Sequence, residues 1–266
     1  MEVFILVFAV ISILPWGFFL VYTQPNSGRD NRIIFIILFA LLLGWLSTEL
    51  VLKTNALFWP EADIKTKVSK HILSEIAFMA FVKAGMLEEL FKSLLILMLA
   101  LVLSYDWKLK VFLPETFLVG GFVSLGFAGI ENYHYIFLAN EGGQGFDNVY
   151  KTFILRTLKS SNAHLLINLC FSMFLIKSNK KKFPDKYWYI FFAFLLAVIQ
   201  HGLFDFFVIP IGRFGYWAAT ALFVGIWVWI VRDRRIYMSE GELFKIEKET
   251  KSSPEVLKPS EPEIIR

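Results

Sequence analysis

Long apolar blocks, separated by short polar segments, run through most of the chain. A helix needs ~20 mainly apolar residues to cross the hydrocarbon core of a bilayer, and the blocks are about that long. The pattern therefore predicts an all-α fold, a polytopic membrane helix bundle with about seven transmembrane helices. The predicted spans are Val3–Tyr22, Ile33–Leu52, Ile76–Leu103, Thr116–Ala139, Phe153–Ile176, Tyr187–Ile209 and Phe214–Val231.

The composition supports this prediction and narrows the expected partners. Of the 266 residues, 56% are hydrophobic and 17% are aromatic, which is too apolar for a soluble domain. The net charge of +4 is modest and the basic residues gather between the spans. The lipid bilayer is therefore the expected partner, and nucleic-acid binding is not indicated. The single cysteine, Cys170, can form no disulfide within the chain, and we expect it to serve packing.

Basic residues are divided unequally between the two sets of alternate loops. The more basic set holds twelve lysines and arginines, and the other set holds six. Loops rich in Lys and Arg stay in the cytoplasm, so we expect the N-terminus outside the cell and the C-terminus in the cytoplasm. The twelve residues are Arg29, Arg32, Lys108, Lys110, Lys177, Lys180, Lys181, Lys182, Lys186, Arg232, Arg234 and Arg235.

The chain is expected to consist of two parts, an integral membrane domain over residues 1–232 and a charged tail over residues 233–266. Three prolines, Pro254, Pro259 and Pro262, interrupt the end of the tail. Because the tail has too little apolar surface to bury, we expect it to be disordered, and the predicted orientation places it in the cytoplasm.

Ionisable and amide residues lie deep within the third to sixth predicted spans. A charge at the bilayer centre costs roughly 2.5–3.5 kcal/mol on insertion scales, so such residues must face a polar interior. This predicts a polar site among these four spans. The residues are Glu88, Glu89 and Lys92 in the third span, Glu131 and Asn132 in the fourth, His164 and Asn168 in the fifth, and His201 and Asp205 in the sixth.

The spacing of these residues indicates that they converge. Glu88 with Lys92, His164 with Asn168, and His201 with Asp205 are each four residues apart, which places both members on one helix face. Counted at ~1.5 Å per residue from the predicted outer ends of the spans, the charged groups agree in depth to within about 8 Å. Structural interpretations stay open for each group: an ion pair at Lys92, an interhelical clamp at Glu131, packing histidines, and an orienting role for Asp205.

Several kinds of chemistry suit two carboxylates with two histidines. A glutamate can act as a general base toward water while neighbouring groups stabilise an oxyanion. The set Glu88, Glu89, His164 and His201 could instead bind zinc or another divalent metal. Intramembrane acids and histidines are also typical of proton-coupled transporters. A transporter, or a non-catalytic membrane chaperone, is the alternative to an enzyme.

The order of the motifs resembles that of the PrsW family of intramembrane proteases and, more distantly, the CAAX-protease and bacteriocin-processing superfamily. The family's Glu-Glu-x-x-Lys motif is matched at residues 88–92, and its Phe-x-x-x-Glu-Asn motif at residues 127–132. A histidine preceded by an arginine eight positions earlier is matched by His164 and Arg156. The last motif, His-x-x-x-Asn or Asp, is matched by His201 and Asp205, where the prenyl-protein endopeptidases have asparagine.

The resemblance implies an intramembrane endopeptidase of a bacterial cell membrane. Its substrate would be a membrane-anchored protein, anti-sigma-factor-like or another single-span protein, cut near the outer face. We expect a glutamate-activated water with histidine assistance and no cofactor, with a divalent metal as the alternative. The expected catalytic residues are Glu88, Glu89, His164 and His201, supported by Lys92, Glu131, Asn132, Asn168 and Asp205.

Overall fold

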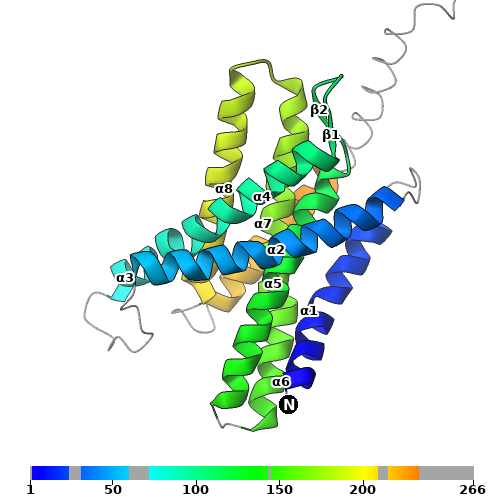
Figure 1. The fold of residues 1–266 in the computed structure, drawn as a ribbon. Helices are drawn as coiled ribbons and strands as arrows, with labels where there is room; N and C mark the ends of the chain where they lie inside the picture. The colour runs from blue at the N-terminus through cyan, green and yellow to red at the C-terminus, as the bar shows by residue number, and fades with distance from the viewer. Residues whose placement is uncertain (1, 24–30, 60–71, 143–144, 209–214, 234–266) are drawn as a thin grey trace, which may run out of the picture.

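The computed structural model describes residues 2–23, 31–59, 72–142, 145–208 and 215–233, and within them it is almost wholly helical (Figure 1). The predicted all-α membrane bundle is confirmed. The elements are α1 (Glu2–Tyr22), α2 (Asn31–Phe58), α3 (Ile72–Phe78), η1 (Met79–Met86), α4 (Leu87–Leu103), β1 (Tyr105–Asp106), β2 (Val111–Phe112), α5 (Thr116–Glu141), α6 (Phe146–Leu155), η2 (Arg156–Ser160), α7 (Ser161–Lys177), η3 (Ser178–Lys180), α8 (Asp185–Val208) and the helix Gly215–Asp233.

Each predicted span corresponds to a helical segment, but only some are apolar throughout. Among the described residues, four helices are long and apolar enough to cross a membrane: Val3–Tyr22, Arg32–Phe58, Asp185–Val208 and Gly215–Asp233. The third and fifth predicted spans are divided by the π-helical segments η1 and η2, and the fourth carries Glu131 and Asn132. The three segments that depart from a simple apolar span are therefore among the four predicted to carry the site.

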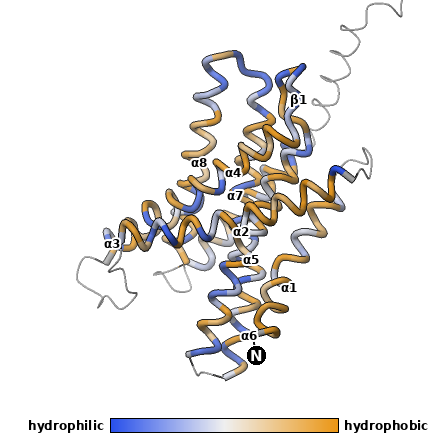
Figure 2. The backbone as a smooth tube through the Cα atoms, viewed as in Figure 1, coloured by the Kyte–Doolittle hydropathy of each residue, from blue (hydrophilic) through white to orange (hydrophobic). Residues whose placement is uncertain are grey.

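Helix α5 lies at the centre of the bundle, where it packs against α1, α2, α4, α6 and α7. Helix α2 crosses α5 at a steep angle (Figure 1). Helix α7 packs beside α5 and forms an antiparallel hairpin with α8. Apolar residues cover most of the helical length, whereas polar residues gather at the ends of the helices and at points inside the bundle (Figure 2). Helix α5 itself carries Glu131 and Asn132, and two of its neighbours, α4 and α7, carry further predicted site residues.

Glycines permit two of the closest helix approaches. A Cβ on Gly44 of α2 would overlap the carbonyl oxygen of Val123 in α5, and a Cβ on Gly126 would overlap that of Leu41. Between η1 and α8, a Cβ on Gly85 would lie 3.2 Å from the Val198 carbonyl oxygen. Small residues let helix backbones approach closely in membrane bundles. Gly85 lies three residues before Glu88. The close approach at Gly85 therefore brings the acidic segment against α8, the helix of His201.

The basic segments lie at one end of the bundle. The short hairpin β1–β2, which the sequence pattern did not predict, is held to the turn after α7 by two hydrogen bonds of 2.8 Å between Asn179 and the backbone of Phe112. Lys186 donates to the Lys110 carbonyl at 3.2 Å, and Lys177 pairs with Asp233 at 2.8 Å. Arg32 donates to the Leu103 carbonyl. All four basic segments predicted on one side of the membrane thus meet at the same end of the bundle. Residues 234–266 of the predicted tail lie outside the described residues.

Candidate active site

Two π-helical segments precede the main acidic and histidine positions. Segment η1 ends at Met86, two residues before Glu88, and η2 ends at Ser160, four residues before His164. A π-helical turn places side chains at angles that an α-helix does not offer, and such turns occur frequently at functional sites. The sequence gives no signal for either segment, although both shape the site.

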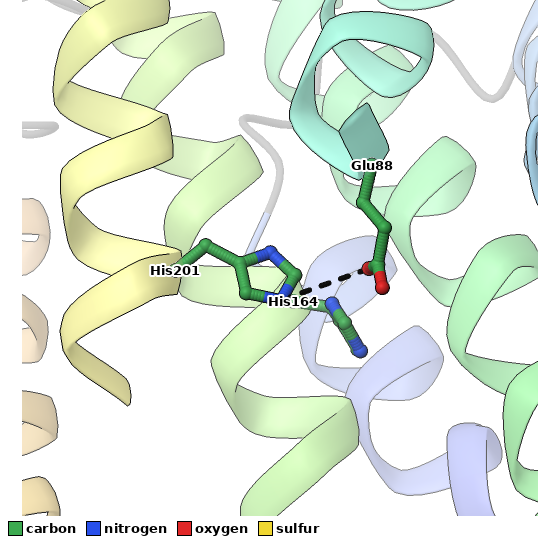
Figure 3. Close-up of side chains that lie close together, drawn as sticks. All are labelled: Glu88, His164 and His201. Atoms are coloured by element: carbon green, nitrogen blue, oxygen red, sulfur yellow. Dashed lines mark ion pairs between the residues drawn. The ribbon is translucent and has the colours of Figure 1, made fainter. Parts of the chain in front are cut away.

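Three of the predicted catalytic side chains converge at one point (Figure 3). Glu88 from α4, His164 from α7 and His201 from α8 each offer a ligand atom within 4.8 Å of the others. The two imidazole rings lie 5.3 Å apart, measured between their centroids. The prediction that separate spans bring their polar residues together is therefore confirmed for these three residues.

The adjacent glutamates occupy different environments. Glu89 is fully buried, and its Oε1 atom lies 2.6 Å from Lys92 Nζ and 2.7 Å from His201 Nδ1. The Glu88 side chain is 13% exposed, and its Oε2 atom lies 3.6 Å from His201 Nε2. Glu89 thus contacts the Nδ1 atom of His201 on the buried side of the ring, while Glu88 lies at the accessible side of the cluster.

Lys92 is fully buried at the centre of the cluster. An ammonium group has three donors, and Lys92 Nζ has three polar neighbours: Glu89 Oε1 at 2.6 Å, His164 Nδ1 at 3.2 Å and Glu88 Oε2 at 3.3 Å. It also lies 4.1 Å from the centroid of the Phe127 ring. The predicted pairing of Glu88 with Lys92 is confirmed, and the lysine also joins α4 to the histidine of α7.

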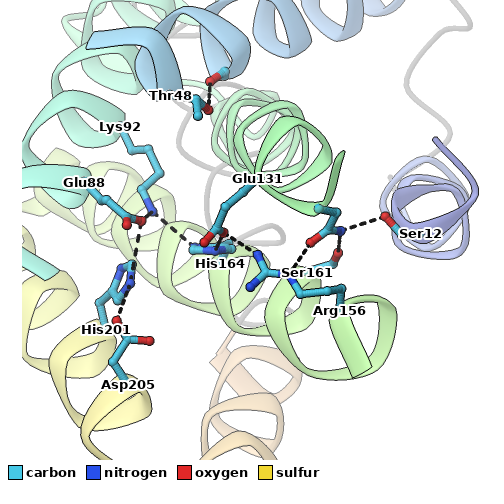
Figure 4. Close-up of polar contacts among 12 residues, drawn as sticks. Ser12, Thr48, Glu88, Lys92, Glu131, Arg156, Ser161, His164, His201 and Asp205 are labelled. Carbon is cyan, nitrogen blue, oxygen red and sulfur yellow. Dashed lines mark hydrogen bonds and ion pairs between the residues drawn. The ribbon is translucent and has the colours of Figure 1, made fainter. Parts of the chain in front are cut away.

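The fourth predicted span contributes Glu131, which lies on the other side of His164 (Figure 4). Its Oε2 atom is 2.7 Å from His164 Nε2 and 2.6 Å from Arg156 Nη2. The next residue, Asn132, accepts a hydrogen bond of 2.7 Å from Arg156 Nε. Glu131 and Asn132 thus hold Arg156 between them, so the arginine joins the site as well as the glutamate.

Two predicted supporting residues lie at the margin of the cluster. Asp205 Oδ2 is 3.5 Å from His201 Nε2, whereas Glu89 contacts the other ring nitrogen at 2.7 Å. Asp205 thus lies beside His201, as the four-residue spacing suggested, but at the ring nitrogen opposite the one that Glu89 contacts. The Asn168 amide donates to the carbonyl of His164 within its own helix at 3.0 Å. This hydrogen bond is with the backbone of the site rather than with a side chain of the cluster.

The fold and these contacts define the class of protein: an integral membrane protein with a carboxylate–histidine site inside its helix bundle. A family model described as "PrsW family intramembrane metalloprotease" matches residues 33–231. Protease PrsW of Clostridioides difficile (strain 630) is 30% identical over 228 residues, which cover 84% of this chain and 86% of that protein. No solved structure matches. The chain belongs to the PrsW family of intramembrane proteases, which confirms the resemblance and leaves the transporter and chaperone alternatives without support.

The name of the family raises the question of whether the residues present suit a metal ion. In metal sites, a ligating histidine almost always gives its other ring nitrogen to a carboxylate or carbonyl partner. His201 has Glu89 at Nδ1 and His164 has Glu131 at Nε2, so the other nitrogen of each ring belongs to the cluster, although that of His164 already has Lys92 Nζ at 3.2 Å. The carboxylate oxygen of Glu88 and the ring nitrogens of His164 and His201 are ligand types that zinc commonly binds. Lys92 Nζ, however, lies within 3.3 Å of two of these ligands, where it already supplies positive charge.

Proposed function

We propose that this protein is an intramembrane endopeptidase that cleaves membrane-anchored protein substrates near the outer face with a water activated by Glu88. The observation that carries this proposal is the unequal burial of the glutamate pair. Glu89 is sealed between Lys92 and His201, whereas Glu88 is partly exposed beside His201 Nε2. A base that must reach both water and substrate needs the accessible position, and Glu88 has it.

Each side chain of the cluster has its own role in the proposed reaction. Glu88 takes a proton from water as the water oxygen adds to the peptide carbonyl, and later returns the proton to the leaving nitrogen. His201 donates from Nδ1 to Glu89, so its Nε2 atom faces Glu88 and the water, and in its protonated form it donates to the developing oxyanion. His164 is held between Lys92 and Glu131 and supports the same region.

The accessible side of the cluster supports cleavage near the outer face. Asp205 follows His201 by one turn in α8, and Arg156 precedes His164 in the chain, so both lie on the side away from the basic end. Both side chains are partly exposed, whereas Asn168 and Ser172 on the basic side are fully buried. Because basic loops stay in the cytoplasm, the accessible side would face outward.

Cysteine labelling tests this orientation. In a Cys170→Ser background, a cysteine introduced at Glu141 is expected to react with a membrane-impermeant thiol reagent from outside intact cells, because Glu141 is exposed at the end opposite the basic segments. A cysteine at Lys181, also exposed, is expected to react only after the membrane is opened. Ser178 would be a poor probe because it is fully buried. Labelling of the Lys181 variant alone from outside would reverse the proposed orientation.

The metal-dependent mechanism is the second candidate, and the two carboxylate–histidine pairs favour it. A divalent ion held by Glu88, His164 and His201 would act as a Lewis acid on water and on the peptide carbonyl. The position of Lys92 favours the glutamate mechanism, because its ammonium contacts Glu88 and His164 and a metal ion there would meet like-charge repulsion.

The two mechanisms are separated by a cleavage assay on purified protein in liposomes. The probes are doubly tagged single-span membrane proteins, reconstituted together with the protein, and cleavage is followed by the size of each tagged fragment. We expect cleavage to continue at an unchanged rate in the presence of 1,10-phenanthroline. Loss of cleavage on chelation, with recovery on adding Zn²⁺ and one zinc bound per chain, would establish the metal mechanism instead.

A further inference from the structure

Asn132 is fully buried, and each polar atom of its side-chain amide has a partner (Figure 4). The Nδ2 atom donates to Ser12 Oγ at 2.7 Å and to Ser161 Oγ at 2.9 Å, while Oδ1 accepts from Arg156 Nε at 2.7 Å. With the amide reversed, Nδ2 would face the guanidinium, and two donors would oppose each other. The guanidinium can only donate, so it selects the amide oxygen, and the two serine hydroxyls hold the amide in this orientation by accepting from Nδ2.

Ser12 is suited to this task because its own hydroxyl is held in place. Its Oγ donates to the Ala9 carbonyl at 2.6 Å, within helix α1, which leaves an oxygen lone pair for Asn132. Ser12 is fully buried and lies on α1, outside the residues 33–231 that the family model matches. Another bond joins α1 directly to the segment that carries Arg156: Trp16 Nε1 donates to the Thr157 carbonyl in η2 at 2.9 Å.

The contacts continue from Asn132 to the reactive histidine. Arg156, held through Nε by Asn132, pairs through Nη2 with Glu131 Oε2 at 2.6 Å. The same Glu131 oxygen lies 2.7 Å from His164 Nε2. A buried charged network depends on each of its partners, because a partner that is lost leaves a charge or a donor unsatisfied.

We propose that Ser12 is a positioning residue of the active site: through Asn132 it holds Arg156, and thereby Glu131, against His164. Helix α1 is then part of the catalytic machinery and not only part of the wall of the bundle. The proposal rests on the proposed function for its kinetic consequences, but the orientation of His164 that it describes is measurable without a substrate.

The substrate-free test is nitrogen NMR of the protein labelled with ¹⁵N-histidine. The chain has four histidines, and the His164 signals are assigned by their absence from His164→Gln. Ser12→Ala is expected to shift the Nε2 signal of His164, and Ser12→Thr, which keeps the hydroxyl, is expected to restore it. The matched control is Ser47→Ala on α2. Ser47 is equally buried and makes the same kind of bond, to the carbonyl three residues earlier at 2.7 Å.

The kinetic test is a double-mutant cycle between Ser12 and Asn132, measured as liposome cleavage of the same tagged probes. Loss of one neutral hydrogen bond corresponds to about a 5- to 10-fold effect, so Ser12→Ala is expected to lower kcat by that factor with KM unchanged. In an Asn132→Ala background, Ser12→Ala is expected to have no further effect. An equal loss in both backgrounds, or an unchanged His164 signal in Ser12→Ala, would overturn the proposal. If the wild-type protein cuts no probe, the proposed function fails and the NMR result alone decides the role of Ser12.

Discussion

Replacing Glu88 by glutamine is expected to reduce kcat by about 10²–10⁴-fold, the usual contribution of a general base. The substitution keeps the size of the side chain and removes only its ability to take a proton from water. Because Glu88 is partly exposed and Lys92 keeps Glu89 as its closer partner, the fold is expected to survive. The measurement is single-turnover cleavage in liposomes, together with thermal unfolding of the purified protein.

The neighbouring glutamate provides the contrast. Glu89→Gln is also expected to reduce cleavage severely, but with a lower Tm, because Glu89 is fully buried and its carboxylate contacts both Lys92 and His201. Glu49→Gln, on α2, is the matched control and is expected to leave the rate unchanged. Wild-type rates in both the Glu88 and Glu89 variants would rule out a glutamate mechanism.

The spans could be predicted from the sequence because the thickness of the bilayer sets the minimum length of an apolar helix that crosses it. About 20 apolar residues are needed to cross it, and the charged residues inside such blocks are costly enough to mark a site. The four-residue spacing was also informative: Glu88 with Lys92 and His201 with Asp205 are in contact. These features are local in the sequence, so periodicity alone reveals them.

The remaining features of the site depend on contacts between distant parts of the chain. Ser12 and Asn132 are 120 positions apart, and a serine in an apolar helix usually satisfies its hydroxyl within that helix. No composition signal marks a π-helical turn, so the sequence did not predict η1 or η2. The different burial of Glu88 and Glu89 depends on how α8 packs against η1, which glycines at 85 and 202 permit. The sequence showed only that the two carboxylates cannot have identical roles.

The structure separates an accessible part of the site from a sealed part. Glu88 lies at the accessible side, whereas Lys92 and Glu89 lie beneath it with no exposure. Buried charges are tolerated only where they are paired, and here one lysine meets two glutamates and a histidine. Under the proposed mechanism, this arrangement would hold the histidines in place before substrate arrives, which is the condition under which electrostatic stabilisation of a transition state is most effective.

His201 is the residue where these two parts meet, so its loss is expected to have an effect as large as that of Glu88. His201→Ala removes the ring atom that faces Glu88 at 3.6 Å and leaves Glu89 with Lys92 as its remaining charged partner. Because acid–base catalysis contributes ~10²–10⁴-fold and one oxyanion donor contributes ~10²–10³-fold, we expect kcat to fall by at least two orders of magnitude. His134→Ala, an exposed histidine on α5, is the control and is expected to retain the wild-type rate.

The same variant separates the two mechanisms when zinc is measured beside the rate. Under the glutamate mechanism, His201→Ala loses activity, and neither it nor the wild type holds stoichiometric zinc after purification. Under the metal mechanism, the wild type holds one zinc per chain, and His201→Ala loses metal and activity together because a ligand is gone. Full activity in His201→Ala would exclude His201 from both mechanisms. Its contact with Glu89 would then be a structural ion pair that joins α4 to α8.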